Sequence, residues 1–252
     1  MDEYREIAPP PRLAEAIECL WTAEQSGPSE PHRVLPDGCA DILFTHRGGT
    51  AALDAIGPMT AYRDFPVPGG PLLLVGVRFR PGMWTACLGV PGEHLRDGIV
   101  PLDDLWGARA RELRDRLAEQ RSAERCAAVF TAALGAPVAA NPVQRALAWM
   151  ERRGGRVDID DLARQAGLGA RQFRRVCLEQ AGLTPKFLAR VLRFRHALAR
   201  LAERPRSFAE FALDCGYYDQ AHCIHEFRAL AGRTPTDFAH DRFFQSPRPD
   251  AA

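Results

Sequence analysis

Four side chains between residues 171 and 175 can donate hydrogen bonds from little more than one helical turn. Arg171, Arg174 and Arg175 carry guanidinium groups, and Gln172 carries an amide. A guanidinium can bind O6 and N7 of guanine with two hydrogen bonds, and it can also pair with a phosphate. A second set of polar side chains follows later in the chain: Gln220, His222, His225 and Arg228. Both sets are therefore candidates for contact with DNA. The alternative is that they are two solvated helix faces.

The other polar residues show no arrangement typical of an enzyme or a metal site. The chain contains no Gly-x-Ser-x-Gly motif, no phosphate-binding loop and no recognisable pair of acids. Zinc ligands usually recur at short spacings, and neither His-x-His nor His-x-x-x-His occurs here. We therefore expect no catalytic residue, no metal and no cofactor, and we regard the scattered metal-ligand candidates as surface residues: His32, Cys39, Asp41, His46 and His94.

Seven cysteines stand at positions 19, 39, 87, 126, 177, 215 and 223. None forms a Cys-x-x-Cys motif, and the odd number predicts no disulfide framework, which suits a reducing cytoplasm. Cys177, Cys215 and Cys223 fall at apolar positions of helical repeats, so we expect them to be small buried hydrophobic residues.

Each candidate set lies on the second helix of a short helix pair, over about residues 158–181 and 207–232. In the first pair Asp158 suits an N-cap, with further acids in the first turn. In the second pair Ser207 and Glu210 predict a capping box. Each first helix stops at a glycine, Gly167 or Gly216, and a turn and a second helix follow. This is the sequence pattern of a helix-turn-helix motif, present twice.

Apolar residues recur at helical spacing on both second helices, and we expect them to pack inward. The candidate DNA-contacting residues then face outward. Glu226 breaks the pattern of the second helix, and a carboxylate near phosphates would weaken DNA binding there. The inward residues are Phe173, Val176 and Cys177 in the first copy, and Cys223, Ile224 and Phe227 in the second.

A longer helix is predicted between the two motifs. Thr184 followed by Pro185 is a strong helix start. Downstream, an apolar stripe consists of Leu188, Val191, Leu192, Leu198 and Leu201. This linking helix would set the distance between the two motifs.

Charge is divided unequally along the chain, although the formal net charge is only +1. Residues 1–140 contain 14 Lys and Arg against 19 Asp and Glu, whereas residues 141–252 contain 19 against 13. The net charges are thus −5 and +6, and the basic part is the one with the helix-turn-helix pattern. Such asymmetry favours contact with nucleic acid.

The first part of the chain reads as β-rich. Strands are predicted at residues 32–35, 40–45 and 72–80, separated by the turn residues Pro36-Asp37-Gly38 and Pro81-Gly82. We expect a small sandwich or barrel. Arg78 and Arg80 alternate on the last strand, where cross-strand ion pairs are a better explanation than binding of an anionic effector.

Helical patterns connect the two parts. Residues 103–118 and 123–134 are amphipathic and would form either a dimer contact or a packed connector. Asn141 before Pro142 caps a further helix, the first of the C-terminal domain. The expected fold class is α+β, with an N-terminal β-rich domain over 1–135 that includes a helical connector at about 103–134, and a DNA-binding domain over 141–245.

Taken together, residues 157–240 resemble the C-terminal DNA-binding domain of the AraC/XylS family of bacterial transcription regulators. The resemblance rests on the motifs Asp161-Leu162-Ala163, Phe173-Arg174-Arg175, Gly182-Leu183-Thr184-Pro185, Ala212-Leu213-Asp214-Cys215-Gly216-Tyr217 and Gly232-Arg233-Thr234-Pro235. It departs from the family at Gly169, where a serine usually caps the first reading helix. Residues 35–44, 76–82 and 100–107 resemble the sensor half of one subset of the family, which implies a cupin-like N-terminal domain.

The resemblance implies a sequence-specific transcription regulator whose partner is double-stranded promoter DNA. The resemblance also allows three further partners: a small-molecule effector whose binding site is unknown, RNA polymerase, and a second copy of the chain. No apolar stretch approaches a membrane span, so a cytoplasmic protein is expected. The alternative is a DNA-repair methyltransferase with an AraC-like head and a zinc-held cysteine, which the dispersed Cys19, Cys39, Cys87 and Cys126 do not favour.

Overall fold

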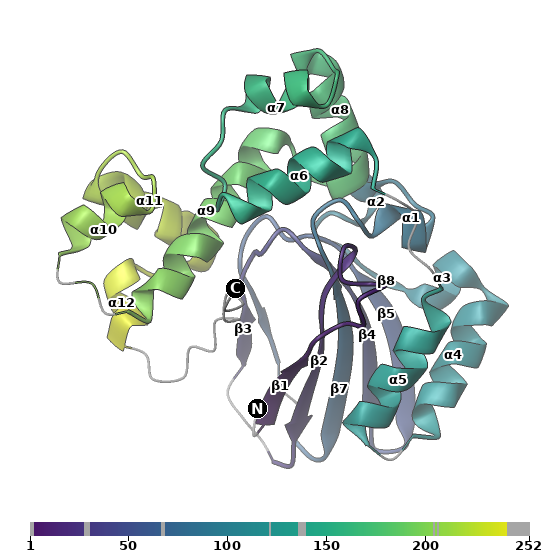
Figure 1. Cartoon of the computed structure of the whole chain (residues 1–252). Helices are drawn as coiled ribbons and strands as arrows, with labels where there is room; N and C mark the ends of the chain where they lie inside the picture. The colour runs from purple at the N-terminus through teal and green to yellow at the C-terminus, as the bar shows by residue number, and fades with distance from the viewer. Residues whose placement is uncertain are drawn as a thin grey trace.

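The protein has an N-terminal domain built on an antiparallel sheet and an all-helical C-terminal domain, which confirms the α+β class. This computed structural model describes residues 3–240 apart from 28–30, 67–68, 121, 136–139, 204 and 206. The expected domain boundary at 136–140 and the end at 241–245 therefore lie largely outside the described residues. Figure 1 shows the sheet at the lower right, with the helices of the C-terminal domain above it and to its left.

One six-stranded sheet carries the N-terminal domain, with the strand order β1-β2-β7-β4-β5-β8 and antiparallel pairing throughout. A separate two-stranded ribbon pairs β3 (His32–Val34) with β6 (Arg63–Phe65). The strands predicted at 32–35, 40–45 and 72–80 are confirmed. The six sheet strands are β1 (Glu3–Ile7), β2 (Ile17–Gln25), β4 (Ala40–Arg47), β5 (Thr50–Ile56), β7 (Leu72–Phe79) and β8 (Ile99–Pro101).

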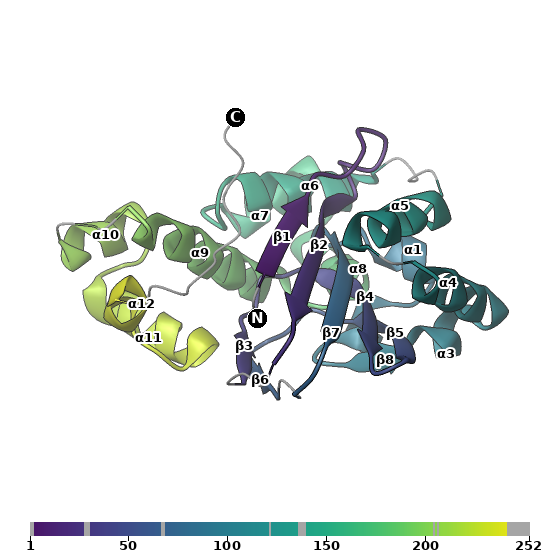
Figure 2. The same cartoon turned by 90° about the horizontal axis from the view of Figure 1, so that it is seen from below.

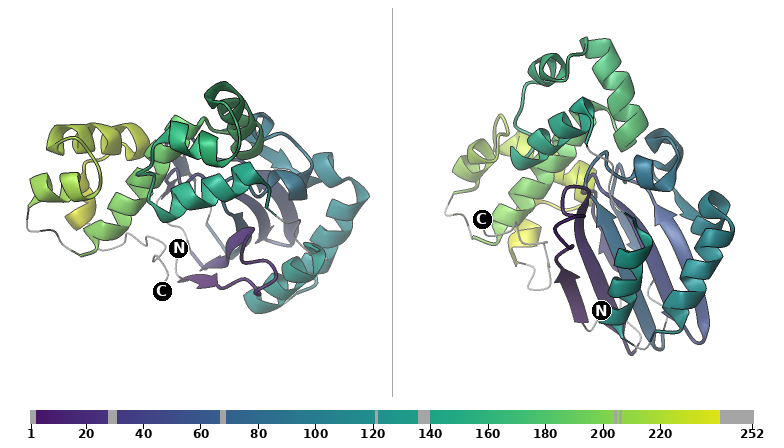
Figure 3. Two further views of the ribbon diagram at one scale, coloured as in Figure 1. Left: turned by 45° about the horizontal axis from the view of Figure 1, so that its top comes forward. Right: turned by 45° about the vertical axis from the view of Figure 1, so that its right-hand side comes forward.

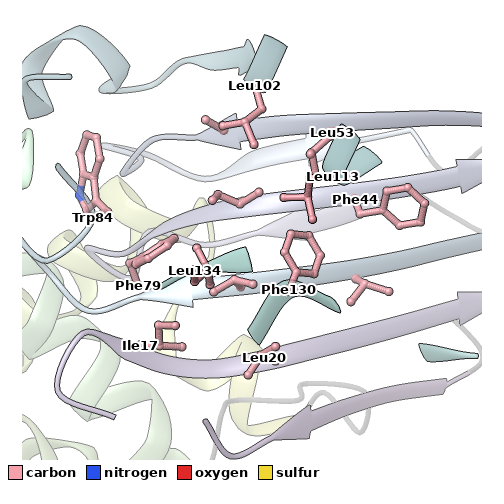
Figure 4. Close-up of a cluster of buried hydrophobic side chains, with 14 of the residues drawn as sticks. Ile17, Leu20, Phe44, Leu53, Phe79, Trp84, Leu102, Leu113, Phe130 and Leu134 are labelled. Carbon is pink, nitrogen blue, oxygen red and sulfur yellow. The ribbon is translucent and has the colours of Figure 1, made fainter. Parts of the chain in front are cut away.

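Helices, and not a second large sheet, close the core of this domain, so the expected sandwich or barrel is wrong. The helices α3 (Leu102–Trp106), α4 (Ala108–Ala118) and α5 (Ala123–Ala133) pack against the strands. Leu113 and Phe130 bury their side chains on the sheet residues Phe44 and Phe79 (Figure 4). The predicted connector is thus part of the N-terminal core, because its apolar stripe covers the apolar face of the sheet.

Seven helices form the C-terminal domain, among the residues that the structure describes. Their apolar faces make two clusters, and the linking helix α9 contributes to both. Figures 2 and 3 show α7 and α8 on one side of α9, and α10 and α11 on the other. The helices are α6 (Pro142–Arg152), α7 (Ile159–Gln165), α8 (Ala170–Ala181), α9 (Pro185–Leu201), α10 (Phe208–Asp214), α11 (Gln220–Ala231) and α12 (Pro235–His240).

The predicted caps account for where these helices begin. Asn141, Asp158, Thr184 and Ser207 each accept a hydrogen bond from the backbone N–H three residues later. Each bond satisfies one of the amide groups that a helix leaves free at its first turn. The helix boundaries in this domain are therefore local properties of the sequence. No helix among the described residues is long and apolar enough to cross a membrane.

The two domains are in close contact. A Cβ atom on Gly38, which has a φ of +81°, would lie 2.7 Å from Cδ1 of Leu188 on α9. Gln144 Nε2 donates to the Gly82 carbonyl at 3.0 Å. Both glycines belong to the turns predicted from Pro-Asp-Gly and Pro-Gly, so these turns also form the surface on which the C-terminal domain packs.

Candidate nucleic-acid interface

The first candidate reading helix, α8, presents its charged side chains to solvent. Phe173, Cys177 and Ala181 are fully buried against α6, α7 and α9. Their spacing leaves the opposite face outward, where the four predicted residues are all exposed: Arg171, Gln172, Arg174 and Arg175. The helix starts at Gly169 with no side-chain cap. Arg171, Gln172 and Arg175 line an open hollow at this end.

Arg175 is partly engaged within its own helix. Its Nη1 lies 3.2 Å from Glu179 Oε2, and both side chains are more than half exposed. An exposed pair at this spacing contributes only about 0.3–0.5 kcal/mol, so DNA phosphates can compete for the guanidinium. Arg171 and Arg174 form no ion pair with the described residues. These two are the best placed of the four for contact with base edges.

The second candidate reading helix, α11, presents fewer charges. Gln220, His225 and Arg228 are exposed, as predicted. His222 is half-buried instead, and its Nδ1 accepts a hydrogen bond from the Tyr218 N–H at 3.2 Å. Its ring also meets the edge of Tyr217, with centroids 5.5 Å apart. His222 thus closes the turn before the helix, and only the other edge of its imidazole remains for DNA.

Glu226 faces inward, so the expectation that it repels phosphates is wrong. Its side chain is 6% exposed and lies between α11 and α9. Arg190 on α9 donates two hydrogen bonds to its carboxylate, at 2.8 and 2.9 Å. A bidentate guanidinium-carboxylate pair fixes both distance and orientation. Glu226 is therefore an anchor of the second reading helix. The repeat places Glu226 in register with the inward Val176 of the first motif. Its partner Arg190 could not be found from periodicity, since it lies on another helix.

The linking helix is held by both motifs and by the N-terminal domain. Leu188, Val191, Leu192, Leu198 and Leu201 are buried, as the apolar stripe predicted. On the side facing the sheet, Arg195 pairs with Glu18 of β2 and with Glu151 of α6. Arg80, at the end of β7, also binds Glu151 with Nη1 3.2 Å from Oε1.

The other strand arginine, Arg78, is used within the N-terminal domain. Its Nε lies 3.4 Å from Asp37 Oδ2 and 3.6 Å from Asp41 Oδ1. Trp21 donates to Asp41 at 2.7 Å. Burial raises the pKa of Asp41 to about 6, although Arg78 beside it acts in the opposite direction. The prediction of a cross-strand ion pair is confirmed for Arg78, which pairs with Asp41 of β4. It is wrong for Arg80, because the partner of Arg80 is Glu151 on helix α6. The residues of an effector site remain unassigned.

The cysteine thiols have raised pKa values. Burial raises the pKa of Cys177 and of Cys223 to about 12 and that of Cys215 to about 11. A thiol with so high a pKa is a poor nucleophile and metal ligand. Cys19 and Cys87 have raised pKa values for the same reason. Within the described ranges no three His, Cys, Asp or Glu side chains gather as metal ligands would. The methyltransferase alternative therefore gains no support.

Comparison with known families matches both domains. Residues 162–241 match a model described as a helix-turn-helix domain. Residues 5–101 match a domain of unknown function, DUF6597. No curated protein is significantly similar to the chain.

Solved structures of transcription factors are more distantly similar. The DNA-binding domain of AdpA in complex with a target DNA is 24% identical, with 40% of this chain and 91% of that one covered and a TM-score of 0.37. A regulator with an AraC-type DNA-binding domain from Chromobacterium violaceum is 24% identical over 43% and 95%, with a TM-score of 0.37. ToxT from Vibrio cholerae is 9% identical over 87% and 97%, with a TM-score of 0.46.

Proposed function

The chain belongs to the AraC/XylS family of DNA-binding transcription regulators, and from this premise we propose that it binds specific promoter sequences through both α8 and α11. The observation that carries the proposal is the exposure of two sets of hydrogen-bond donors on the second helices of two motifs, on either side of one linking helix. A reading helix of this kind inserts into the major groove of DNA. We also propose the boundaries 1–135 and 141–245 for the two domains.

The two helices have different roles in this proposal. Arg171 and Arg174 read base edges, because they are exposed and form no ion pair with the described residues. Gln172 and Arg175 add contacts to bases or phosphates. The second helix mainly positions the protein on the duplex, with Gln220, His222, His225 and Arg228 as its DNA-facing residues.

The N-terminal domain supplies the regulatory input in this proposal. Its contacts with α9 through Gly38 and Arg195 offer a physical route from the sheet to both reading helices. Three further partners remain predictions: a small-molecule effector, RNA polymerase and a second copy of the chain.

The test measures binding of the full chain to labelled duplexes from a random library, over a range of salt concentrations. Neutralising phosphates releases counterions, so log K should fall with log[salt] at a slope of about −0.9 for each phosphate contacted. Replacing Arg171, Arg174 and Arg175 together by Ala should remove most of the binding.

A matched control replaces Arg111 and Arg116 by Ala. Both arginines are exposed on α4, far along the chain from the reading helices, so binding and its salt slope should stay at the wild-type value. Wild-type protein without salt-dependent binding, or a triple variant that binds as well as wild type, would contradict the proposal.

A further inference from the structure

The N-terminal domain contacts the C-terminal end of the first reading helix. Gly182 ends α8 in the left-handed conformation, with a φ of +70°. A Cβ atom on this glycine would lie 2.7 Å from the Gly92 carbonyl oxygen and 2.9 Å from Pro58 Cγ. From the other side, a Cβ atom on Gly92 would lie 2.3 Å from the Gly182 nitrogen. The two backbones meet so closely that neither glycine leaves room for a side chain.

The same domain contacts the C-terminal end of the second reading helix. The Tyr62 backbone N–H donates to the Leu230 carbonyl at 3.0 Å. Arg33 Nη1 donates to the Ala231 carbonyl at 3.2 Å. The last carbonyls of a helix have no partner within the helix, so these donors cap α11. The Tyr62 ring lies against Gly232, where a Cβ atom would be 2.7 Å from Cε1. Figure 2 shows β3 and β6 beside this end of α11.

One short stretch of chain, residues 58–62, takes part in both contacts, with Pro58 against Gly182 and Tyr62 against the end of α11. We name this stretch the bridging loop. Four residue steps of extended chain span at most about 14 Å, so the loop ties together the ends of two helices from different motifs. The contact points are equivalent in the two motifs. Gly182 and Gly232 each begin a Gly-x-Thr-Pro sequence, which ends one reading helix and starts the next helix, α9 or α12.

Asp97 holds the bridging loop in shape. Its two carboxylate oxygens accept from the Thr60 N–H at 2.7 Å and the Thr60 hydroxyl at 2.8 Å. Its own N–H donates to the Pro58 carbonyl at 3.1 Å, and its carbonyl accepts from Arg63 at 2.8 Å. Asp97 has a φ of +58°, the only positive φ of a non-glycine residue in the described chain. This conformation is costly for most side chains, which is consistent with a residue kept in place by its contacts.

We infer that the bridging loop, held by Asp97, sets the relative position of the two reading helices, and that Tyr62 and Asp97 are positioning residues for DNA recognition. The inference rests on the proposed function. The contacts of the loop lie at the C-terminal ends of α8 and α11, and Arg171, Arg174 and His225 remain exposed. The N-terminal domain therefore leaves the candidate reading faces open, and it acts on the geometry of binding by fixing the spacing at which both helices can enter DNA.

Two variants of the full chain weaken the bridge without touching a reading residue. Asp97→Gly removes the carboxylate, and glycine adopts a positive φ freely, so the backbone is not strained. Tyr62→Ala removes the ring that lies on Gly232. Asp97→Asn is the rescue variant, because its amide oxygen can still accept a hydrogen bond and asparagine tolerates this conformation. Asp104→Ala, an exposed aspartate on α3, is the matched control.

The measurement is selection of bound sequences from a random duplex library. Wild type, Asp97→Asn and Asp104→Ala should select two half-sites at one spacing. Asp97→Gly and Tyr62→Ala should select the same half-sites at several spacings, a result that a merely stabilising role would not produce. Retention of one spacing in both variants would overturn the inference, as would loss of the half-site sequences themselves. If wild type selects no sequence, the proposed function fails, and the inference falls with it.

A second measurement needs no DNA. Amide hydrogen exchange of the free proteins should be faster at residues 178–182 and 228–232 in Asp97→Gly than in wild type or Asp104→Ala, because both helix ends lose their support. Unchanged exchange at both ends would overturn the inference even if the protein binds DNA as proposed.

Discussion

The two helix-turn-helix motifs share one scaffold but differ in what they expose. When the reading helices are aligned on Gly182 and Gly232, the arginines of α8 have weaker counterparts on α11. Arg171 aligns with Ala221, Arg174 with Ile224, and Arg175 with His225. The buried positions, by contrast, keep their apolar character, as Phe173 and Cys223 show. The core thus determines that both helices form, and the surface determines what each can bind.

The motifs also differ in how the reading helix is anchored. Val176 of α8 aligns with Glu226 of α11, and only the second forms an ion pair with α9. The N-caps differ as well. Asp219 accepts from the His222 N–H at 2.7 Å, whereas Gly169 offers no side chain. The helix with fewer charges for DNA is therefore the more firmly fixed, which suits one helix that reads and one that positions.

The largest expected effect comes from breaking the anchor of α11. Arg190→Ala leaves Glu226 buried without its partner. Removing one member of a fully buried pair costs about 3–5 kcal/mol, and because Arg190 is one-third exposed we expect about 2–4 kcal/mol. Urea denaturation would show the loss as a lower midpoint.

The matched variant makes the second motif resemble the first. Glu226→Val combined with Arg190→Ala removes both charges and places at position 226 the residue type of Val176, so most of the lost stability should return. A single Arg190→Ala variant as stable as wild type would show that the ion pair does not anchor the helix.

An intermediate effect is expected from the surface difference. Arg174→Ala should lose about 1–3 kcal/mol of discrimination at one or two base pairs, because it removes a bidentate donor. Arg228→Ala on α11 should weaken binding to all sequences alike and reduce the salt slope by about 0.9. Affinities for a selected site and its single-base variants measure both. If both variants lost as much affinity for specific DNA as for random DNA, Arg174 would not read a base.

The smallest effect is expected at the N-caps. Gly169 has extended backbone angles, φ −73° and ψ 154°, and a Cβ atom added to it would have no neighbour within 4 Å. Gly169→Ser should therefore add a capping hydrogen bond and a few tenths of a kcal/mol, while Asp219→Gly should cost about as much. Thermal unfolding of both variants against wild type measures the two shifts. Shifts of the same sign would contradict the capping argument.

Local patterns in the sequence determined the C-terminal domain. Thr184 with Pro185, Asp158 and Ser207 mark helix starts because a cap bonds to a backbone group only a few residues away. The stripe from Leu188 to Leu201 identifies the linking helix because residues on one helical face recur at a fixed period. Exposure of Arg171 and Arg174 follows from the same period. None of these conclusions needs knowledge of a distant residue.

Only the tertiary structure decided how the parts meet. From the sequence Glu226 was expected to be a surface charge. In the structure it is buried, because Arg190 on another helix forms an ion pair with it. From the sequence, the helices after residue 102 could form either a dimer contact or a packed connector. The structure shows that they pack on the apolar face of the sheet. The bridging loop carried no signal, because Pro58 and Tyr62 act through Gly182 and Gly232, far away in the chain. Such contacts depend on chain segments brought together by folding, and no period or local motif of the sequence encodes that proximity.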